Sequence, residues 1–390
     1  MRALVVAPQP FFTPRGTPFS VYYRTLTAAE LGVETDLLTY GEGRDVEIPG
    51  VALYRIPRLK FLEPVPVGPS WRKAVLDAIL VVWTVAFLIR GRYDFVHAHE
   101  ESVFFLRFLK PLFRFKLVYD MHSSLPQQLR NFDFTRSRVL IGAFRALEDT
   151  CLRHADAVIT ICPELEEYAR PRMPDPGRHF LIENSRFEEV RVDDGGREAV
   201  AVGASPDVPR DRPIVVYAGT FEAYQGIGLL LRAFASVRSR LPDAFLLLVG
   251  GTREQVKTYR DLASELGLGD DVRFTGRVDP ASAERYVQSA TVLTSPRTKG
   301  TNTPLKIYRL LASGAPLVAT RITSHTQVLG EEVCFLVEPD PESMADGIVA
   351  ALEDTTRRDR VVRGATELYR NRYAPEAYRQ KMQLLLEALR

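Results

Sequence analysis

The strongest constraint on this chain is a repeated pattern: a short apolar run, a polar loop, then a helical stretch. In the first half, the apolar runs are residues 4–7, Phe95–His99, 116–120 and 157–161, and in the second half the pattern restarts at Ile214–Ala218. Uniformly apolar strands that alternate with helices are typical of parallel sheets covered on both faces. The pattern therefore predicts a doubly wound α/β protein.

One segment interrupts the pattern near the middle of the chain. Residues 186–212 are charged, rich in Gly and Pro, and without periodicity, which is typical of a linker. A chain of 390 residues also fits two domains better than one. We expect an N-terminal domain over residues 1–190, a linker over 191–212 and a C-terminal domain over 213–373. A final helix within 374–390 is expected to pack back on the N-terminal domain.

Composition excludes some functions. The 51 Lys and Arg residues nearly balance the 49 Asp and Glu residues, which argues against a dedicated nucleic-acid binder. The three cysteines, Cys151, Cys162 and Cys334, have no short paired spacing. They are typical of reduced thiols in a cytoplasmic protein and do not indicate a zinc site.

Two apolar segments bear on membranes. Residues 78–89 form an apolar run of 12 residues, whereas a spanning helix needs about 20. We interpret this run as a buried or interfacial helix, and the first residues as a strand, not a signal peptide. Residues 104–116 interleave aromatics with Arg107, Lys110 and Arg114, which suits peripheral docking on an anionic membrane face. A core helix with a solvated basic edge explains the same pattern equally well.

Ligands of open parallel sheets bind beyond the carboxyl ends of the strands. The residues expected at those ends are 14–17, 97–101, 120–124, 219–225, 250–251 and 295–303. Two such rows that face each other would form a cleft for one elongated ligand.

The stretch 295–320, SPRTKGTNTPLKIYRLLASGAPLVAT, resembles the nucleotide-sugar segment of glycosyltransferase family four. Other pieces match this family in order: 7–17, 97–99, Met121 with His122, 155–159, 247–251 and 274–278. The resemblance covers nearly the whole chain. It implies a GT-B fold and retaining sugar transfer from a nucleotide-diphosphate donor to a glycan or lipid-linked acceptor. It implies neither a cofactor nor a metal.

The donor segment supports this resemblance physically. Thr303 and Pro304 predict an N-cap and a first helical residue, so that free helix N–H groups and Lys306 face an anion. Arg297 and Lys299 add positive charge, which favours a diphosphate site over an ordinary capped helix. Short side chains that could read sugar hydroxyls stand beside them: Thr301, Asn302 and Thr303.

The remaining candidates follow from strand ends and matched motifs. Gly16 would let the backbone approach a phosphate, or simply form a turn. His122 is the catalytic candidate, since a neutral histidine there could contact the reacting sugar, although a structural role is the alternative. His97 is expected in the core. Further donor-binding candidates are Thr17, Thr220, Gln225, Gly251, Arg277, Val278 and Arg309, and acceptor-binding candidates are Arg15, His99, Glu100 and Ser123.

Four charges that the family uses are absent. Thr301 and Arg309 replace its two glutamates, and Thr220 and Gln225 replace an Arg and a Lys that neutralise the departing diphosphate. We expect a divergent active branch in which other cations do this work. They are Arg15, Arg297, Lys299 and Lys306.

Alternatives stay open at this point. Arg309 either contacts the nucleotide or lies outside the site, and the nearest acids that could replace a lost glutamate are Glu222 and Glu338. A GT-B epimerase would need histidines from both domains, and the C-terminal half offers His325. An inactive partner subunit that binds a nucleotide-sugar or a glycan is the non-enzymatic alternative. The loop 64–69 could instead shape a pocket for a soluble acceptor.

Overall fold

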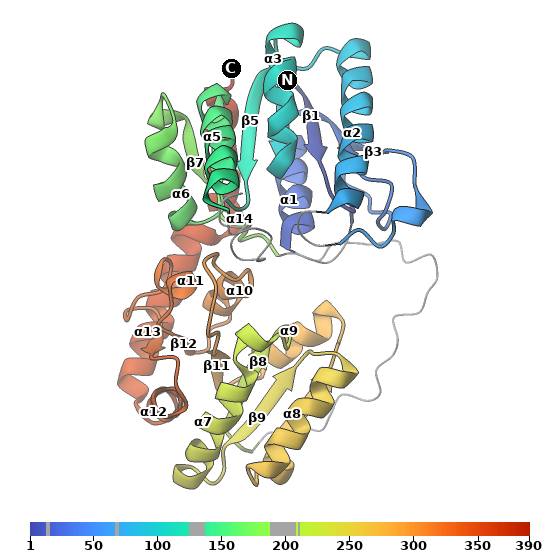
Figure 1. Cartoon of the computed structure of the whole chain (residues 1–390). Coiled ribbons are helices and arrows are strands. Elements are labelled where there is room, and N and C mark those ends of the chain that lie inside the picture. Colours follow the sequence, from blue (N-terminus) through green and yellow to red (C-terminus); the bar gives the residue numbers. More distant parts are fainter. Residues whose placement is uncertain (13–15, 67–69, 125–136, 188–207, 210) are drawn as a thin grey trace. The chain divides into compact units, whose positions relative to one another are not determined.

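The computed structural model describes residues 1–12, 16–66, 70–124, 137–187, 208–209 and 211–390. The chain divides into two compact α/β units (Figure 1). Unit 1 comprises Met1–Gly196 and Pro375–Arg390, and unit 2 comprises Arg197–Ala374. The expected linker, 191–212, lies largely outside the described residues.

Unit 1 contains a seven-stranded parallel sheet in the order β3-β2-β1-β4-β5-β6-β7. Its strands are β1 (Arg2–Ala7), β2 (Glu34–Thr39), β3 (Val51–Arg55), β4 (Phe95–His99), β5 (Lys116–Met121), β6 (Ala157–Thr160) and β7 (His179–Leu181). Its helices are α1 (Gly16–Glu30), α2 (Trp71–Arg90), α3 (Val103–Phe113), α5 (Arg138–His154), α6 (Pro163–Ala169) and α14 (Pro375–Ala388).

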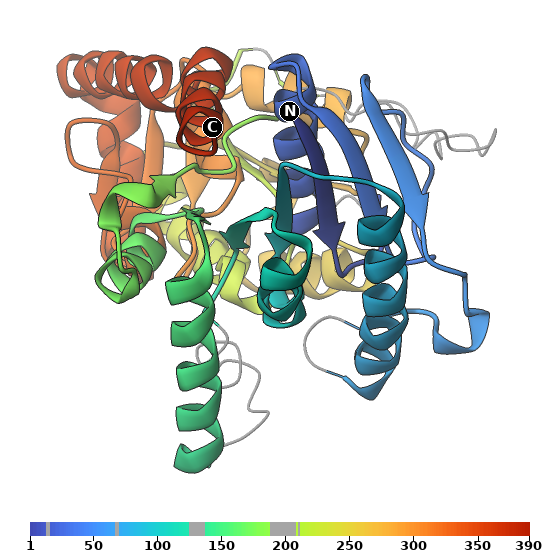
Figure 2. The ribbon, with the colours of Figure 1, turned by 90° about the horizontal axis from the view of Figure 1, so that it is seen from above.

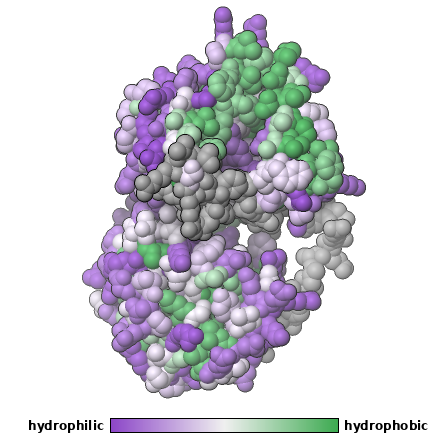
Figure 3. Space-filling model, in the orientation of Figure 1, coloured by the Kyte–Doolittle hydropathy of each residue, from purple (hydrophilic) through white to green (hydrophobic). Residues whose placement is uncertain are grey.

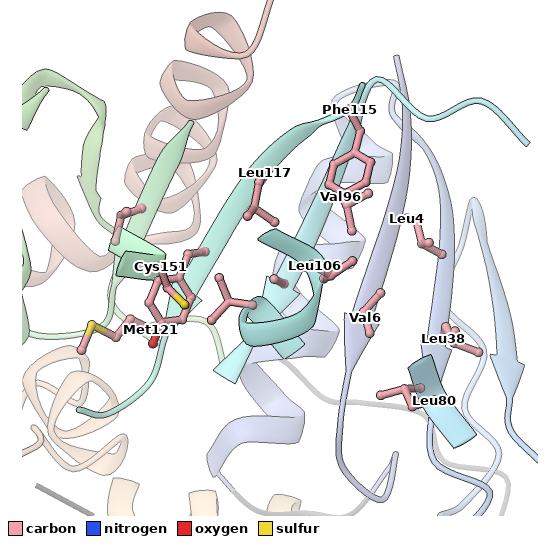
Figure 4. Close-up of a cluster of buried hydrophobic side chains, with 14 of the residues drawn as sticks. Leu4, Val6, Leu38, Leu80, Val96, Leu106, Phe115, Leu117, Met121 and Cys151 are labelled. Carbon is pink, nitrogen blue, oxygen red and sulfur yellow. The ribbon is translucent and has the colours of Figure 1, made fainter. Parts of the chain in front are cut away.

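Both faces of this sheet are covered, as Figure 2 shows from above. One core lies between the sheet and helices α2, α3 and α5, and includes Leu80, Leu106 and Cys151 (Figure 4). The other core holds side chains of α1 and of the C-terminal helix α14, among them Tyr22 and Tyr378. The last helix of the chain therefore completes the hydrophobic core of the first domain.

Helix α2 shows how local sequence forms one of these covers. The Ser70 hydroxyl accepts a hydrogen bond from the backbone N–H of Lys73 at 3.2 Å and caps the helix. Its buried residues, Leu76, Leu80, Thr84 and Leu88, recur every four positions, so one face packs on the sheet. The apolar run 78–89 thus lies within a helix of 20 residues, of which one face is buried while the opposite face is exposed.

Unit 2 contains a six-stranded parallel sheet in the order β10-β9-β8-β11-β12-β13. Its strands are β8 (Ile214–Ala218), β9 (Phe245–Val249), β10 (Val272–Gly276), β11 (Val292–Ser295), β12 (Leu317–Thr320) and β13 (Phe335–Val337). Its helices are α7 (Ile227–Arg240), α8 (Arg253–Glu265), α9 (Pro280–Gln288), α10 (Lys306–Ala312), α11 (Thr323–Thr326), α12 (Pro341–Glu353) and α13 (Thr355–Leu368). Leu230, Leu246 and Ile348 belong to its main core.

The predicted fold class, two doubly wound α/β halves, is confirmed. The sequence analysis missed β7 and β13, which are edge strands of three residues each. In each sheet the strand order reverses once, between β1 and β4 in unit 1 and between β8 and β11 in unit 2. These switch points are where open α/β sheets bind ligands.

Candidate active site

The donor segment departs from its predicted form. Helix α10 begins at Lys306, and the residue that precedes it, Leu305, makes no side-chain cap. Thr303 is therefore not an N-cap, and its buried hydroxyl has no hydrogen-bond partner among the described residues. Pro304 is also not the first helical residue, because Pro304 and Leu305 precede a helix of seven residues that begins at Lys306.

The side chain of Lys306, one of the basic residues of this segment, lies at the end of β8. Its Nζ lies 4.0 Å from the centre of the Tyr217 ring and has no hydrogen-bond partner in the described part of the chain. Burial, and secondarily the charge of Arg297, lowers the pKa of Lys306 to about 7. A buried ammonium without a carboxylate is rare in proteins, which marks Lys306 as a functional candidate.

Arg297 follows β11 and supplies the second cation. Its guanidinium lies over the ring of Tyr224 at 5.0 Å and donates to the backbone oxygen of Asn302 at 3.2 Å. Burial lowers its pKa, and its Nε has no hydrogen-bond partner among the described residues. Gly300 has φ 133°, and a Cβ there would lie 2.5 Å from a nitrogen of Arg297, so only glycine leaves room for this side chain. The structure thus brings together two predicted donor-binding residues, Arg297 and Lys306.

The other predicted residues of the segment differ in how exposed their side chains are. Lys299 is exposed, and Thr301 and Asn302 are half-buried. The backbone oxygen of Thr301 accepts a hydrogen bond from the Gln327 side chain at 2.7 Å. This hydrogen bond holds the loop through its backbone.

The loop after β8 holds the donor candidates Thr220 and Gln225. It is supported by a residue that the sequence analysis missed. The Tyr217 hydroxyl donates to the backbone oxygen of Thr220 at 2.7 Å and lies 3.4 Å from Oε1 of Gln225. Tyr217 is fully buried and supports both this loop and Lys306. Its position inside an apolar strand gave no sequence signal of this role.

Two donor candidates have structural explanations, and two others lie at the sheet edge. A Cβ at Gly251, where φ is 85°, would lie 2.4 Å from the ring of Phe221, so packing alone requires glycine. Arg309 forms an ion pair with Glu284 of α9 at 3.4 Å. Arg277, like its neighbour Val278, follows β10 at the sheet edge, and β9 separates β10 from β8.

The proposed acidic replacements and the C-terminal histidine are also engaged elsewhere. Glu338 pairs with Arg321 at 3.1 Å, and Glu222 accepts a hydrogen bond from Gln255 at 3.3 Å. His325 is buried between the Ser295 hydroxyl and the backbone oxygen of Thr320, at 3.0 and 2.8 Å, and burial lowers its pKa to about 4. His325 is thus a neutral structural residue, which removes the histidine that an epimerase would need.

In unit 1, the strand ends hold a buried group of charged and aromatic side chains, which we call the Asp120 group: Arg24, His97, His99, Asp120, His122 and Tyr378. The β4–β5 register places His99 opposite Asp120. Asp120 Oδ2 accepts from Arg24 Nε at 2.8 Å and from His97 Nε2 at 3.0 Å. Arg24 also donates to the Tyr378 hydroxyl at 2.7 Å, so α14 takes part in the group.

Electrostatics keep the charges of this group in balance. Burial disfavours the charge of Asp120, but the guanidinium of Arg24 and the nearby histidines hold its pKa well below the usual range. Burial lowers the pKa of His122 to about 4 and that of His99 well below its usual value. His122, the catalytic candidate, is therefore a neutral imidazole held 3.0 Å from His99 Nδ1.

The structure corrects the expectation that His99 faces a cleft. His99 is fully buried, and its ring stacks on that of His97 with centroids 4.5 Å apart. His97 is buried as expected. His97, His99 and Asp120 could together offer three metal ligands within 4.8 Å. Because Asp120 already binds the Arg24 guanidinium, a hydrogen-bond network accounts for this arrangement.

Glu100 stands at the end of β4 in a left-handed backbone conformation, with φ 49°. Burial, and secondarily the charge of Glu101, raises the pKa of Glu100 to about 7. Glu101 pairs with Lys73 of α2, and the Tyr40 hydroxyl donates to Asp77 at 2.5 Å. A backbone in this strained region at a strand end, with a carboxyl group that titrates near neutrality, is typical of a functional position.

The last candidates lie at the ends of β1 and β5. Arg15 lies outside the described residues. Gly16 and Thr17 open α1, and a Cβ at Gly16 would meet no described atom within 4 Å. No steric reason in the described part of the chain thus requires glycine there. Ser123 follows β5 and is half-buried.

Two doubly wound α/β units, each with a single switch point, form the architecture of the GT-B glycosyltransferases. Residues 24–185 match the family model "Glycosyl transferase 4-like domain", and residues 212–354 match "Glycosyl transferases group 1". A phosphatidyl-myo-inositol mannosyltransferase of Mycobacterium leprae is 32% identical over 79% of this chain and 77% of the relative. The chain belongs to this family of group 1, family-four glycosyltransferases and is an enzyme that transfers a hexosyl group.

Solved structures agree with this fold. Sucrose-phosphate synthase from Thermosynechococcus elongatus has a TM-score of 0.73 and 22% identity, and the match covers 99% of this chain and 98% of the other. Anabaena HepE in complex with UDP has a TM-score of 0.72 and 15% identity, over 99% and 100% of the two chains.

Proposed function

We propose that unit 2 binds the diphosphate of a nucleotide-sugar donor through Lys306 and Arg297. The observation that carries this proposal is the pair itself: two largely buried cations at a switch point, with no ion-paired carboxylate in the described part of the chain. A diphosphate would supply the missing negative charge. The pair thereby takes over the task of the Arg and Lys that Thr220 and Gln225 replace. The complex of HepE with UDP supports a nucleotide ligand for this fold.

In the proposed reaction, the bond between the sugar C1 and the β-phosphate oxygen breaks, and its electron pair leaves with the nucleoside diphosphate. An acceptor hydroxyl forms the new bond to C1, and its proton passes to the departing phosphate. Side-chain cations stabilise the charge that develops on the leaving group, so the step uses no metal. We further propose that the configuration at C1 is retained.

We place the acceptor in unit 1, at the edge formed by Glu100, His122 and Ser123. The carboxyl group of Glu100 and the neutral ring of His122 offer hydrogen-bonding groups to sugar or inositol hydroxyls. The mannosyltransferase named above acts on phosphatidyl-myo-inositol by its name. An inositol-bearing glycolipid is therefore the first acceptor to test.

Release of free nucleotide tests this function directly. The purified enzyme is incubated with UDP-glucose, GDP-mannose or ADP-glucose, with and without phosphatidylinositol vesicles. We expect one donor to be hydrolysed slowly alone and consumed at least tenfold faster with an acceptor. A folded protein that consumes none of these donors would contradict the proposal.

We also propose that unit 1 docks on an anionic membrane face. No helix described in the structure has the length and apolar character to cross a bilayer. However, exposed hydrophobic side chains gather over α2 and α3 (Figure 3). We call this set the apolar stripe, and its members are Trp71, Val75, Val82, Ile89, Phe108 and Leu112.

A basic groove of about 970 Å³ adjoins the α3 end of the apolar stripe. Arg107, Arg114 and Arg153 line it, and none of them forms an ion pair within the described residues. Lys110, in contrast, pairs with Asp156 at 2.7 Å. Apolar side chains beside unpaired arginines suit a surface of anionic lipid headgroups.

Flotation with vesicles tests the docking surface. We expect the enzyme to float with vesicles that contain anionic lipid and less with neutral ones, and Leu112→Ser to reduce the bound fraction severalfold. Leu384→Ser removes another exposed leucine, outside the stripe, and serves as the matched control. Equal loss in both variants, or no flotation of the wild type at low salt, would contradict this surface.

A further inference from the structure

The surroundings of Lys306 leave its ammonium group without compensation. Its Nζ is buried, contacts the face of Tyr217 and has no hydrogen-bond partner among the described residues. Gly219 leaves the backbone next to Nζ uncovered, because it has no side chain and a Cβ at this position would lie 3.5 Å from Nζ. Contact with the aromatic face attracts a cation only weakly compared with the loss of water.

Among the described residues, the charged groups that follow β11 or lie on α10 and α11 do not supply a counter-charge. After β11, Arg297 repels the ammonium group. On α11, His325 is neutral near pH 7 and locked by Ser295 and Thr320. On α10 itself, Arg309 is paired with Glu284 of α9.

The aromatic and loop groups that face this site are neutral or engaged. Tyr217 keeps its proton, because burial raises the pKa of its hydroxyl group. Tyr224 lies under Arg297. Glu222 binds Gln255 of α8 and does not contribute to the electrostatics of Lys306.

We propose that the buried Lys306 gives up its proton readily in the free enzyme and takes one up when the diphosphate of the donor binds. This inference rests on the proposed function of unit 2 as the donor site. A diphosphate placed against Nζ restores the counter-charge that the fold omits, so the charged form of Lys306 becomes the stable one. Binding and protonation are then linked, and donor affinity falls as the pH rises.

The size of the linkage follows from the pKa of about 7 in the free enzyme. About 0.9 proton per donor should be taken up at pH 8 and about 0.1 at pH 6, and Kd should rise about tenfold between these pH values. Nucleotide-sugars are the right probes, because their diphosphate is a diester without the terminal phosphate group that titrates near pH 6.

Isothermal titration of the full-length enzyme tests this inference. UDP-glucose, GDP-mannose and ADP-glucose are first screened at pH 6, and the tightest ligand is then titrated at pH 6 and 8 in two buffers of different ionisation enthalpy. The buffer dependence of the heat gives the number of protons directly, without any variant.

Two variants and a control test whether the proton that is taken up on binding goes to Lys306. Lys306→Arg carries a permanent charge, so binding should persist while the proton uptake at pH 8 disappears. Lys306→Met should weaken binding at least tenfold at pH 6 and make it independent of pH. Lys257→Met replaces an exposed lysine of α8 and should behave as the wild type.

The outcomes separate the two proposals. Binding at pH 6 without proton uptake at pH 8 overturns the inference and leaves the donor site standing. Proton uptake that survives in Lys306→Arg also overturns it, because another group would then titrate. If the folded wild type binds none of the three nucleotide-sugars at pH 6, the proposed function fails first.

Discussion

The two strand-end clusters of this enzyme handle charge in opposite ways. In unit 1, Asp120 accepts hydrogen bonds from Arg24 and His97, so a buried anion and a buried cation satisfy each other. In unit 2, Lys306 and Arg297 are both basic side chains, and neither forms an ion pair with a carboxylate of the described chain. The first cluster holds buried charges of both signs in direct contact. By the proposal made above, the diphosphate of the donor supplies negative charge to the second.

Because of this difference, we expect the buried charges of unit 1 to affect mainly the stability of the enzyme and those of unit 2 to affect mainly its chemistry. A buried ion pair that loses one partner leaves an uncompensated charge, which is strongly destabilising. A cation that is already uncompensated lowers stability while it is present, and is retained when it serves a function. The same kind of substitution should therefore have opposite effects in the two units.

The largest effect is expected for Asp120→Asn in unit 1. It leaves Arg24 buried without its counter-ion and should lower the free energy of unfolding of unit 1 by about 3–5 kcal/mol. Hydrogen–deuterium exchange of peptides from β4 and β5 measures this loss. Asp45→Asn, at an exposed ion pair with Arg55, is the matched control and should cost at most about 1 kcal/mol. Similar losses in both variants would contradict the central role of Asp120.

In unit 2, Lys306→Met should lower the rate of sugar transfer about a hundredfold or more, the usual effect of removing one preorganised charge. Its stability should rise instead of fall, because the variant removes a desolvated, unpaired ammonium group. At pH 6, where Lys306 is mostly charged, calorimetry should show a Tm of unit 2 higher by a few degrees. A lower Tm together with full activity would break the comparison.

The smallest expected effect is on the stability of unit 2 at acidic pH. His325 has a pKa of about 4 in the fold and about 6.5 when unfolded. The unfolded state therefore binds more protons as the pH falls from 6.5 to 4, and unit 2 loses stability over that window. Replacing His325 by Gln should reduce the loss between pH 7 and 5.5 by on the order of 1 kcal/mol.

Urea unfolding at the two pH values measures this change. The pKa values of His99 and His122 are lowered in the same sense, so unit 1 should be more acid-sensitive than unit 2. An unchanged pH dependence in His325→Gln would show that other groups of unit 2 control its acid sensitivity.

Much of the fold was predictable because strand periodicity is a local signal. The predicted strands Phe95–His99 and Ile214–Ala218 coincide with β4 and β8. The start of α10 was predicted wrongly, since Thr303 and Pro304 have the residue types of a cap without its geometry. Residue type alone does not reveal whether a threonine hydroxyl reaches a backbone N–H.

The sequence by itself determined the two doubly wound halves and the basic segment that holds Arg297 and Lys306. Only the tertiary structure decided that His99 is buried, that Asp120 has Arg24 as its partner, and that Tyr378 of α14 accepts a hydrogen bond from Arg24. The physical reason is the separation along the sequence of the residues that set each property. Periodicity and composition are set by neighbours along the chain, whereas burial and charge compensation are set by residues far apart in sequence, such as Arg24 and Asp120 or Tyr217 and Lys306.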